Sequence, residues 1–100
     1  MLFQIDSENF DDSIKSGLKL VVFTAKWCSF CQKILPELKK VALNGYWIGE
    51  LDVDKNTSLV QAYEVNGFPT IFIFNNGKLK GSIVGYQTSS EILAQLKRYS

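Results

Sequence analysis

Apolar residues lie along the chain in blocks, and their spacing predicts the secondary structure. Residues 18–24, LKLVVFT, form a near-continuous apolar run, and residues 70–74, TIFIF, form another. Such runs are typical of strands that are covered on both faces of a sheet. Shorter apolar stretches over residues 2–5 and 46–53 predict two more strands, the first of them an edge strand or the first strand of the sheet.

Between these runs, the apolar residues recur with a helical period. Five of them predict the apolar face of a helix over residues 28–43: Ile34, Leu35, Leu38, Val41 and Ala42. Pro36 falls inside this helix, and we expect a kink there because proline removes one backbone donor. Ser7 is expected to cap a helix over residues 8–16, and either residue of the Asn-Thr pair at 56–57 is expected to cap another.

The C-terminal part of the chain carries two local signals. Asn76-Gly77 is a turn sequence that closes β-hairpins, so the strand after it should run antiparallel to residues 70–74. Thr88 and Glu91, three residues apart, form a capping box that opens the last helix. Four residues predict its apolar face: Ile92, Leu93, Leu96 and Tyr99.

The predicted order of elements is β-α-β-α-β-α-β-β-α. A helix between two strands is expected to form a parallel, right-handed crossover, and the final hairpin adds an antiparallel pair. The pattern therefore predicts an α/β protein with a mixed sheet of about five strands flanked by four helices. Because no linker or internal repeat divides the chain, residues 1–100 are expected to form one domain.

Composition narrows the classes of function. The chain has 11 basic and 10 acidic residues, a net charge of +1, which gives no reason to expect binding to nucleic acid or to a membrane. No apolar run approaches the ~18 residues of a membrane-spanning helix. Residues 1–10 lack the basic start and long apolar stretch of a signal peptide, although removal of such a peptide is compatible with the sequence. Histidine is absent, so the commonest general base and metal ligand is missing.

The only two cysteines lie three residues apart in the stretch WCSFCQ, residues 27–32. Cys28 falls at the predicted end of a strand and the start of a helix, where unpaired N–H groups and the helix dipole favour a thiolate over a thiol. Cys31 is one turn further along, within reach of a disulfide, and the helix should shield it as a thiol. This asymmetry indicates that Cys28 attacks a disulfide and that Cys31 then displaces the reduced product.

Three other interpretations of the cysteine pair are weaker. A zinc site needs about four Cys, His or acidic ligands, and the chain has no second cysteine pair. Two inert buried cysteines would have no reason to coincide with a strand end and a helix start. A static disulfide across so short a loop would stabilise the fold little. The pair is therefore expected to act without a metal or an organic cofactor.

Several motifs together resemble the thioredoxin family over essentially the whole chain. AKWCSFC, residues 25–31, is similar to the family's Ala-x-Trp-Cys-x-x-Cys, and Pro36 lies where the family has a helix-kinking proline. VNGFPT, residues 65–70, resembles the segment that holds the family's cis-proline. NNG and VGY match the hairpin glycine and the last-strand glycine, at Gly77 and Gly85. The resemblance implies a thioredoxin fold and an enzyme that reduces protein disulfides.

Carried over position by position, the resemblance implies roles for five residues of the site. Cys28 is the nucleophile, Cys31 is the resolving thiol, and Trp27 flanks them. Pro69 is expected to be cis, with the backbone of Phe68 facing the cysteines and pairing with an extended substrate through strand-like hydrogen bonds.

Other positions near the pair keep two interpretations each. Gly67 and Gly85 either let a partner backbone approach closely or serve turns and packing. Ser29 either donates a hydrogen bond to the Cys28 thiolate or caps the helix start, and Phe30 either contacts partners or packs. The family usually has Gly-Pro at these two positions, and its oxidases and isomerases often have a histidine there. The absence of that histidine favours a reductant.

The chain also departs from the family at a buried acid. Thioredoxins usually carry this acid six residues before the first cysteine and use it to deprotonate the resolving cysteine, but this position is Val22 here. A neighbouring strand position, usually lysine in the family, is Glu50 here. We expect either that Glu50 accepts the proton of Cys31, directly or through a water molecule, or that Glu50 is an exposed strand residue without such a role.

The resemblance also implies partners and a compartment. Protein disulfides would be the substrates of a cytoplasmic monomer, and a thioredoxin-reductase-like partner would supply the flavin and nicotinamide that this chain lacks. One alternative is a disulfide oxidase or isomerase outside the cytoplasm. Another is an interaction module in which Trp27, Phe30 and Phe68 form a docking patch and redox chemistry is secondary. A glutathione-dependent role is less favoured because Tyr86-Gln87, after Gly85, lacks the acidic residue that often follows there.

Overall fold

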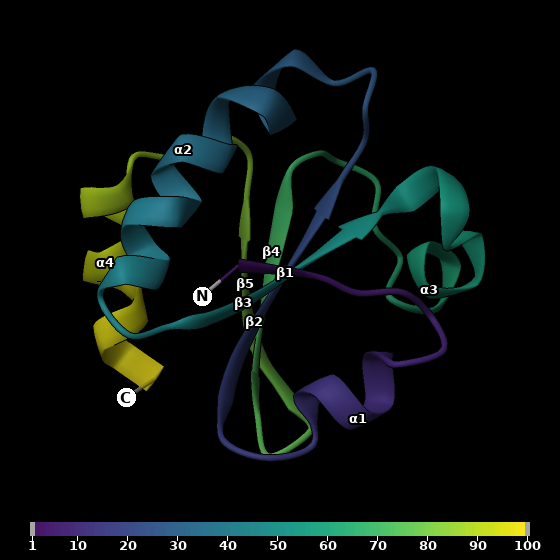
Figure 1. The fold of residues 1–100 in the computed structure, drawn as a ribbon, viewed down its shortest axis with the longest axis horizontal. Helices are drawn as coiled ribbons and strands as arrows, with labels where there is room; N and C mark the ends of the chain where they lie inside the picture. The colour runs from purple at the N-terminus through teal and green to yellow at the C-terminus, as the bar shows by residue number, and fades with distance from the viewer. Residues whose placement is uncertain (1, 100) are drawn as a thin grey trace.

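A computed structural model describes residues 2–99, and the order of its strands and helices agrees with the sequence prediction (Figure 1). The strands are β1 (Leu2–Gln4), β2 (Leu18–Thr24), β3 (Trp47–Asp52), β4 (Thr70–Asn75) and β5 (Lys78–Val84). The helices are α1 (Phe10–Ile14), α2 (Ser29–Leu43), α3 (Thr57–Ala62) and α4 (Ser89–Leu96), with short 3₁₀ turns at Val53–Lys55 and Lys97–Tyr99.

The five strands form one mixed sheet in the order β1-β3-β2-β4-β5. β1, β3 and β2 are parallel, whereas β4 runs antiparallel to β2 and β5 runs antiparallel to β4. The expectation that every helix between two strands forms a parallel crossover is therefore wrong for the connection from β3 to β4.

α2 and α3, the helices before and after β3 in the chain, differ in length. α2 has 15 residues and extends about 22 Å, enough to carry the chain back along a strand. α3 has six residues and extends only about 9 Å, whereas a strand of six residues such as β4 spans about 20 Å. The chain enters β4 at the end where β3 stops, and Thr70 pairs with Phe23 near the carboxyl end of β2. This reversal brings the start of β4 to the edge where α2 begins.

The helices cover both faces of the sheet, as predicted. α2 and α4 lie on one face, and α1 and α3 lie on the other (Figure 1). The first face buries an aliphatic core in which Ile34 and Leu38 of α2 pack on Val22 and Ile48. Aromatic rings fill the second core, where Phe10 lies edge-on to Phe74 with 5.7 Å between ring centroids.

Local signals at the hairpin and at α4 are confirmed. Asn76 and Gly77 have φ values of 50° and 81°, the positive values that a tight hairpin turn of this type requires. The side chain of Thr88 accepts from the N–H of Glu91, and the Glu91 carboxylate accepts from the N–H of Thr88, which completes the capping box. α2 runs without interruption through Pro36, and the kink predicted there stays a prediction.

The cap predicted at Ser7 is wrong. α1 begins at Phe10, because Asp6 accepts hydrogen bonds from the backbone of Glu8 and Asn9 and holds residues 6–9 in a turn. The N–H of Ser7 instead donates to the side-chain oxygen of Asn56, with 2.9 Å between the atoms. Asn56 does precede α3, but its side chain makes no capping bond because it is engaged with Ser7 and with the carbonyl of Asp52.

Candidate active site

Cys28 lies between the end of β2 and the first turn of α2, as the sequence predicted. It is the N-cap residue of α2, and its sulfur accepts a hydrogen bond from the backbone N–H of Cys31 at 3.2 Å. The Cys28 thiol also points to the carbonyl oxygen of Phe68 at 3.7 Å. Both cysteines are free thiols, and Cys28 is half-buried. The sulfur of Cys28 is therefore reachable and lies against backbone groups of two different segments.

Cys31 differs from Cys28 in exposure and in acidity. Its side chain is fully buried. Burial is the main cause that raises the pKa of the Cys31 thiol to about 12. The contact with Cys28 and the negative charge of Glu50 raise this pKa further, whereas a hydrogen bond with the backbone of Ala25 lowers it. The site thus holds one accessible sulfur and one shielded, protonated thiol.

The segment before β4 faces this pair. The Phe68–Pro69 peptide bond is cis, which confirms the expectation from the resemblance. Pro69 is buried, and its carbonyl oxygen accepts a hydrogen bond from the N–H of Gly85 at 2.8 Å. Gly85 has a φ of 89°, a conformation that favours glycine, and no atom would lie within 4 Å of an added Cβ. Gly85 therefore serves a turn and also leaves open space beside Pro69.

Trp27 flanks the pair, and the structure adds a partner that the sequence analysis missed. The indole N–H donates to a carboxylate oxygen of Asp54 at 3.0 Å, and the ring lies edge-on to Phe68 with centroids 5.7 Å apart. Trp27 is nevertheless 67% exposed. Asp54 follows β3, which is the neighbour of β2 in the sheet, and so lies at the same sheet edge as Cys28. The order of strands could therefore have indicated that Asp54 lies near Trp27.

The two residues between the cysteines lie at the surface. Ser29 is exposed and makes no hydrogen bond with its side chain within residues 2–99, and Cys28 rather than Ser29 caps α2. The proposed cap at Ser29 is therefore wrong. Phe30 is 55% exposed, with the Lys33 ammonium 5.7 Å from its ring centroid. Phe30 presents an apolar surface next to a positive charge.

Glu50 lies in β3 directly opposite Val22 of β2. Its carboxylate accepts hydrogen bonds from the Gln4 amide at 2.6 Å and from the Thr24 hydroxyl at 3.0 Å. Glu50 is half-buried, so it is not a freely exposed strand residue. The sequence analysis missed Gln4 and Thr24, because their contact with Glu50 depends on the pairing of three strands.

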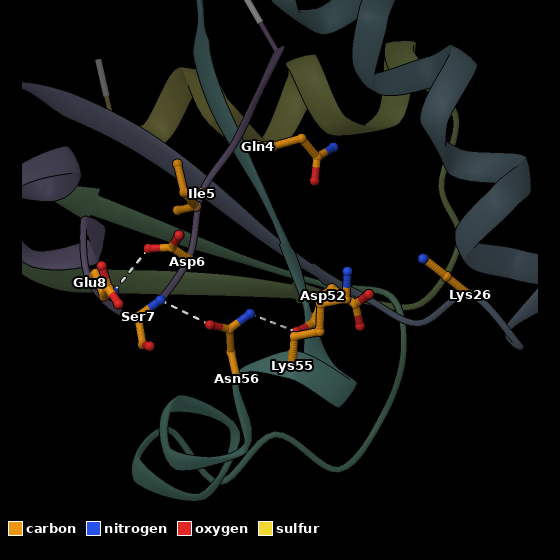
Figure 2. A pocket seen from close by; sticks show the side chains of 9 residues that line it. All are labelled: Gln4, Ile5, Asp6, Ser7, Glu8, Lys26, Asp52, Lys55 and Asn56. Atoms are coloured by element: carbon orange, nitrogen blue, oxygen red, sulfur yellow. Dashed lines mark hydrogen bonds between the residues drawn. The ribbon is translucent and has the colours of Figure 1, made fainter.

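A polar pocket of about 460 Å³ opens at the same edge of the sheet, and Figure 2 shows the nine residues that line it. Gln4 and Lys26 border it, Asp52 and Lys55 contribute charges, and Asn56 bridges two backbone segments at its floor. Within residues 2–99, no group of three or more His, Cys, Asp or Glu side chains is placed to hold a metal ion. None of the helices described is long and apolar enough to cross a membrane.

Comparisons with known proteins agree with this geometry. The thioredoxin family profile matches residues 1–98. A thioredoxin of Staphylococcus haemolyticus is 35% identical over 103 residues, with 98% of this chain and 97% of the relative covered. A thioredoxin of Chlamydia pneumoniae is 39% identical over 94 residues, with 92% of this chain and 91% of the relative covered. A thioredoxin of Staphylococcus aureus is 33% identical over 101 residues, with 98% of this chain and 97% of the relative covered.

Proposed function

The chain belongs to the thioredoxin family, and we propose that Cys28 is the residue that attacks protein disulfides and Cys31 the residue that resolves the product. The activity itself is that of a thiol–disulfide oxidoreductase, which reduces protein disulfides by dithiol–disulfide exchange. One observation carries the assignment of roles: the accessible Cys28 sulfur accepts the N–H of the fully buried Cys31.

The exchange balances in two steps. The Cys28 thiolate attacks one sulfur of the substrate disulfide, so that a Cys28–substrate disulfide forms and the other substrate sulfur leaves as a thiolate. Cys31 then loses its proton, and its thiolate attacks the Cys28 sulfur. The Cys28–Cys31 disulfide forms, the bond to the substrate breaks, and the second substrate thiolate leaves. Two electrons have passed from the protein to the substrate.

Glu50 is the proposed proton acceptor for Cys31 in the second step. Cys31 is strongly protonated, so its attack requires a base, and the described residues around it contain no histidine. The negative charge of Glu50 raises the pKa of the Cys31 thiol, which supports a position of the carboxylate near that thiol. If Glu50→Gln leaves the rate and pH profile of disulfide reduction unchanged, Glu50 does not have this role.

The proposed substrate surface surrounds Cys28. Trp27 and Phe30 offer exposed rings, and the backbone of Phe68 would pair with an extended substrate segment next to Pro69. The open space at Gly85 would admit the substrate backbone. Ser29 borders the same surface.

We further propose the setting in which the dithiol works. Residues 1–100 act as one domain and as a cytoplasmic monomer, without a bound metal or organic cofactor. A thioredoxin-reductase-like partner, which carries the flavin and the nicotinamide, returns the Cys28–Cys31 disulfide to the dithiol. Protein disulfides are the substrates, and neither nucleic acid nor a membrane is a partner.

The direction of the chemistry is tested by the redox potential of the Cys28–Cys31 couple. If the protein is a reductant, the couple should have a reduction potential of about −270 mV, whereas the potential of an isomerase is about −180 mV. The protein would be equilibrated with glutathione buffers of known potential. The fraction of chains in which both cysteines can then be alkylated gives the reduced fraction in each buffer. A value in the isomerase range would favour the oxidase or isomerase alternative.

Reduction of a protein disulfide such as that of insulin, with a small dithiol as the electron source, tests the roles of the cysteines. Cys28→Ser should abolish the catalysed rate, because no other accessible thiol is available within residues 2–99. Full retention of biological activity by Cys28→Ser would instead support the interaction module, whose docking patch would be the exposed rings of Trp27 and Phe30 with Phe68.

A further inference from the structure

We propose that Thr24 and Gln4 are positioning residues for the Glu50 carboxylate and that they hold it in place to receive the proton of Cys31. This inference rests on the proposed role of Glu50 as the proton acceptor. It adds two residues from two other strands to the machinery of the second step, in a chain that has Val22 where the family usually has its acid.

Strand register brings the three side chains together. β3 lies between β1 and β2, with Gln4 of β1 and Val22 of β2 paired to Glu50 on either side. Thr24 is two residues beyond Val22, so its side chain points to the same face of the sheet. That face is the one that α2 covers, and Val22 belongs to its core. The carboxylate therefore lies under the helix that carries Cys31.

The two hydrogen bonds engage different oxygens of the carboxylate. Gln4 Nε2 donates to Oε1 at 2.6 Å, and Thr24 Oγ1 donates to Oε2 at 3.0 Å. A carboxylate accepts hydrogen bonds at both of its oxygens, so the two donors can hold it in place at the same time. Two bonds from opposite neighbouring strands also restrict rotation of the Glu50 side chain.

The two partners differ in their access to water. Thr24 is only 5% exposed, whereas Gln4 is exposed and lines the polar pocket shown in Figure 2. The Glu50 carboxylate thus extends from a buried hydroxyl on one side to a residue of an open polar pocket on the other. In the second step, the proton of the Cys31 thiol passes to Glu50. When the substrate thiolate has left, that proton passes from Glu50 to the solvent.

A merely structural role would make the same contacts, since the Gln4 bond also ties the edge strand β1 to β3. The two roles differ in which step a substitution slows. Loss of positioning slows the attack of Cys31 on the mixed disulfide and leaves the attack of Cys28 unchanged. General loosening of the sheet edge affects both steps and the stability of the protein.

The experiment is single-turnover reduction of a disulfide-containing peptide by the reduced full chain, quenched with acid and resolved by mass into dithiol, mixed disulfide and oxidised protein. The variants are Thr24→Val, Gln4→Met, Glu50→Gln and Thr24→Val/Glu50→Gln. Thr24→Ser keeps the hydroxyl, and Gln61→Met is a matched control on the exposed part of α3. Each variant is measured between about pH 5 and 9, around the range in which a general base acts.

We expect Glu50→Gln to slow the second step by about 100-fold, the size of a typical general-base effect. Thr24→Val and Gln4→Met should each slow it by about tenfold, with mixed disulfide accumulating and the first step unchanged. Thr24→Ser, which keeps the hydroxyl, should leave the rate of the second step unchanged. Thr24→Val should slow the Glu50→Gln protein no further, because it acts through the carboxylate.

Three results would overturn the proposal. If Glu50→Gln slows the second step but Thr24→Val and Gln4→Met do not, positioning fails and the role of Glu50 stands. If Glu50→Gln has no effect, both fail. If Thr24→Val slows both steps equally, or slows the Glu50→Gln protein by a further tenfold, Thr24 acts by another route. Gln4→Met keeps the test valid if Thr24→Val does not fold, because Gln4 is at the surface.

Discussion

The backbone N–H of Cys31 donates a hydrogen bond to the sulfur of Cys28, with 3.2 Å between nitrogen and sulfur. The first turn of α2 thus uses the thiol of its own N-cap residue as the acceptor for one of its unpaired N–H groups. Burial keeps the Cys31 thiol protonated, whereas the Cys28 sulfur is only half-buried. Two cysteines that are three residues apart thus present one reachable sulfur and one shielded thiol.

The first prediction concerns alkylation of the reduced protein. At about pH 8, iodoacetamide should modify Cys28 at least about 100-fold faster than Cys31, because a thiol with a pKa raised to about 12 has little thiolate at that pH and this one is fully buried. Mass spectrometry of the digested protein measures the two rates. Cys28→Ser is the control and should show no fast modification. Equal rates at the two cysteines would contradict the assignment.

A second prediction concerns stability at alkaline pH. The pKa of Cys31 is raised from an ordinary 9.0 to about 12, so the unfolded chain loses this proton first as the pH rises. The free energy of unfolding should fall between these two values, with a slope of up to about 1.4 kcal/mol per pH unit from this group. Urea unfolding of the reduced protein measures it. Cys31→Ala should lack this part of the slope, and equal slopes in both proteins would argue against it.

Asp54 is predicted to affect substrate binding through Trp27. Asp54→Ala removes the acceptor of the indole N–H and lets the ring move, so KM for a protein disulfide should rise about three- to tenfold, as expected for one hydrogen bond. The kcat should change by less than about twofold. Reduction of a small disulfide reagent should not change. Asp11→Ala, an exposed acid on α1, is the control. An equal loss with small and protein substrates would show that the ring does not act by contacting the protein substrate.

Ser29 is predicted to have little influence on the redox potential. Its side chain makes no hydrogen bond within the described part of the chain, and the donor to the Cys28 sulfur is the Cys31 backbone. Ser29→Ala should therefore move the potential by less than about 10 mV in glutathione buffers. A shift of about 30 mV or more would mean that the hydroxyl stabilises the thiolate, as the other interpretation of Ser29 holds.

Chemistry that is local in the sequence could be predicted from it. The positions of Cys28 and Cys31 follow from one strand end and one helical turn, both visible as residue spacing. The Asn76-Gly77 turn and the Thr88 capping box are also short-range signals. These features need no knowledge of how distant strands pair.

Features that depend on strand pairing could not be predicted in the same way. The direction of β4 depends on its antiparallel pairing with β2, which the pattern of apolar residues does not show. The contacts of Glu50 with Gln4 and Thr24 need the order β1-β3-β2. The N–H of Ser7 donates to the side chain of Asn56, 49 positions away, a contact that no local pattern indicates.

The most direct test of the roles of the two cysteines is mass measurement of the adduct that Cys31→Ser forms with a disulfide-bonded peptide. Without a resolving thiol, the reaction should stop at the mixed disulfide, with one peptide per chain bound through Cys28. Cys28→Ser should form no such adduct at a comparable rate, because Cys31 is buried and protonated. If Cys28→Ser captured the peptide as fast as Cys31→Ser, or if neither did, the assignment of Cys28 as the attacking residue would be wrong.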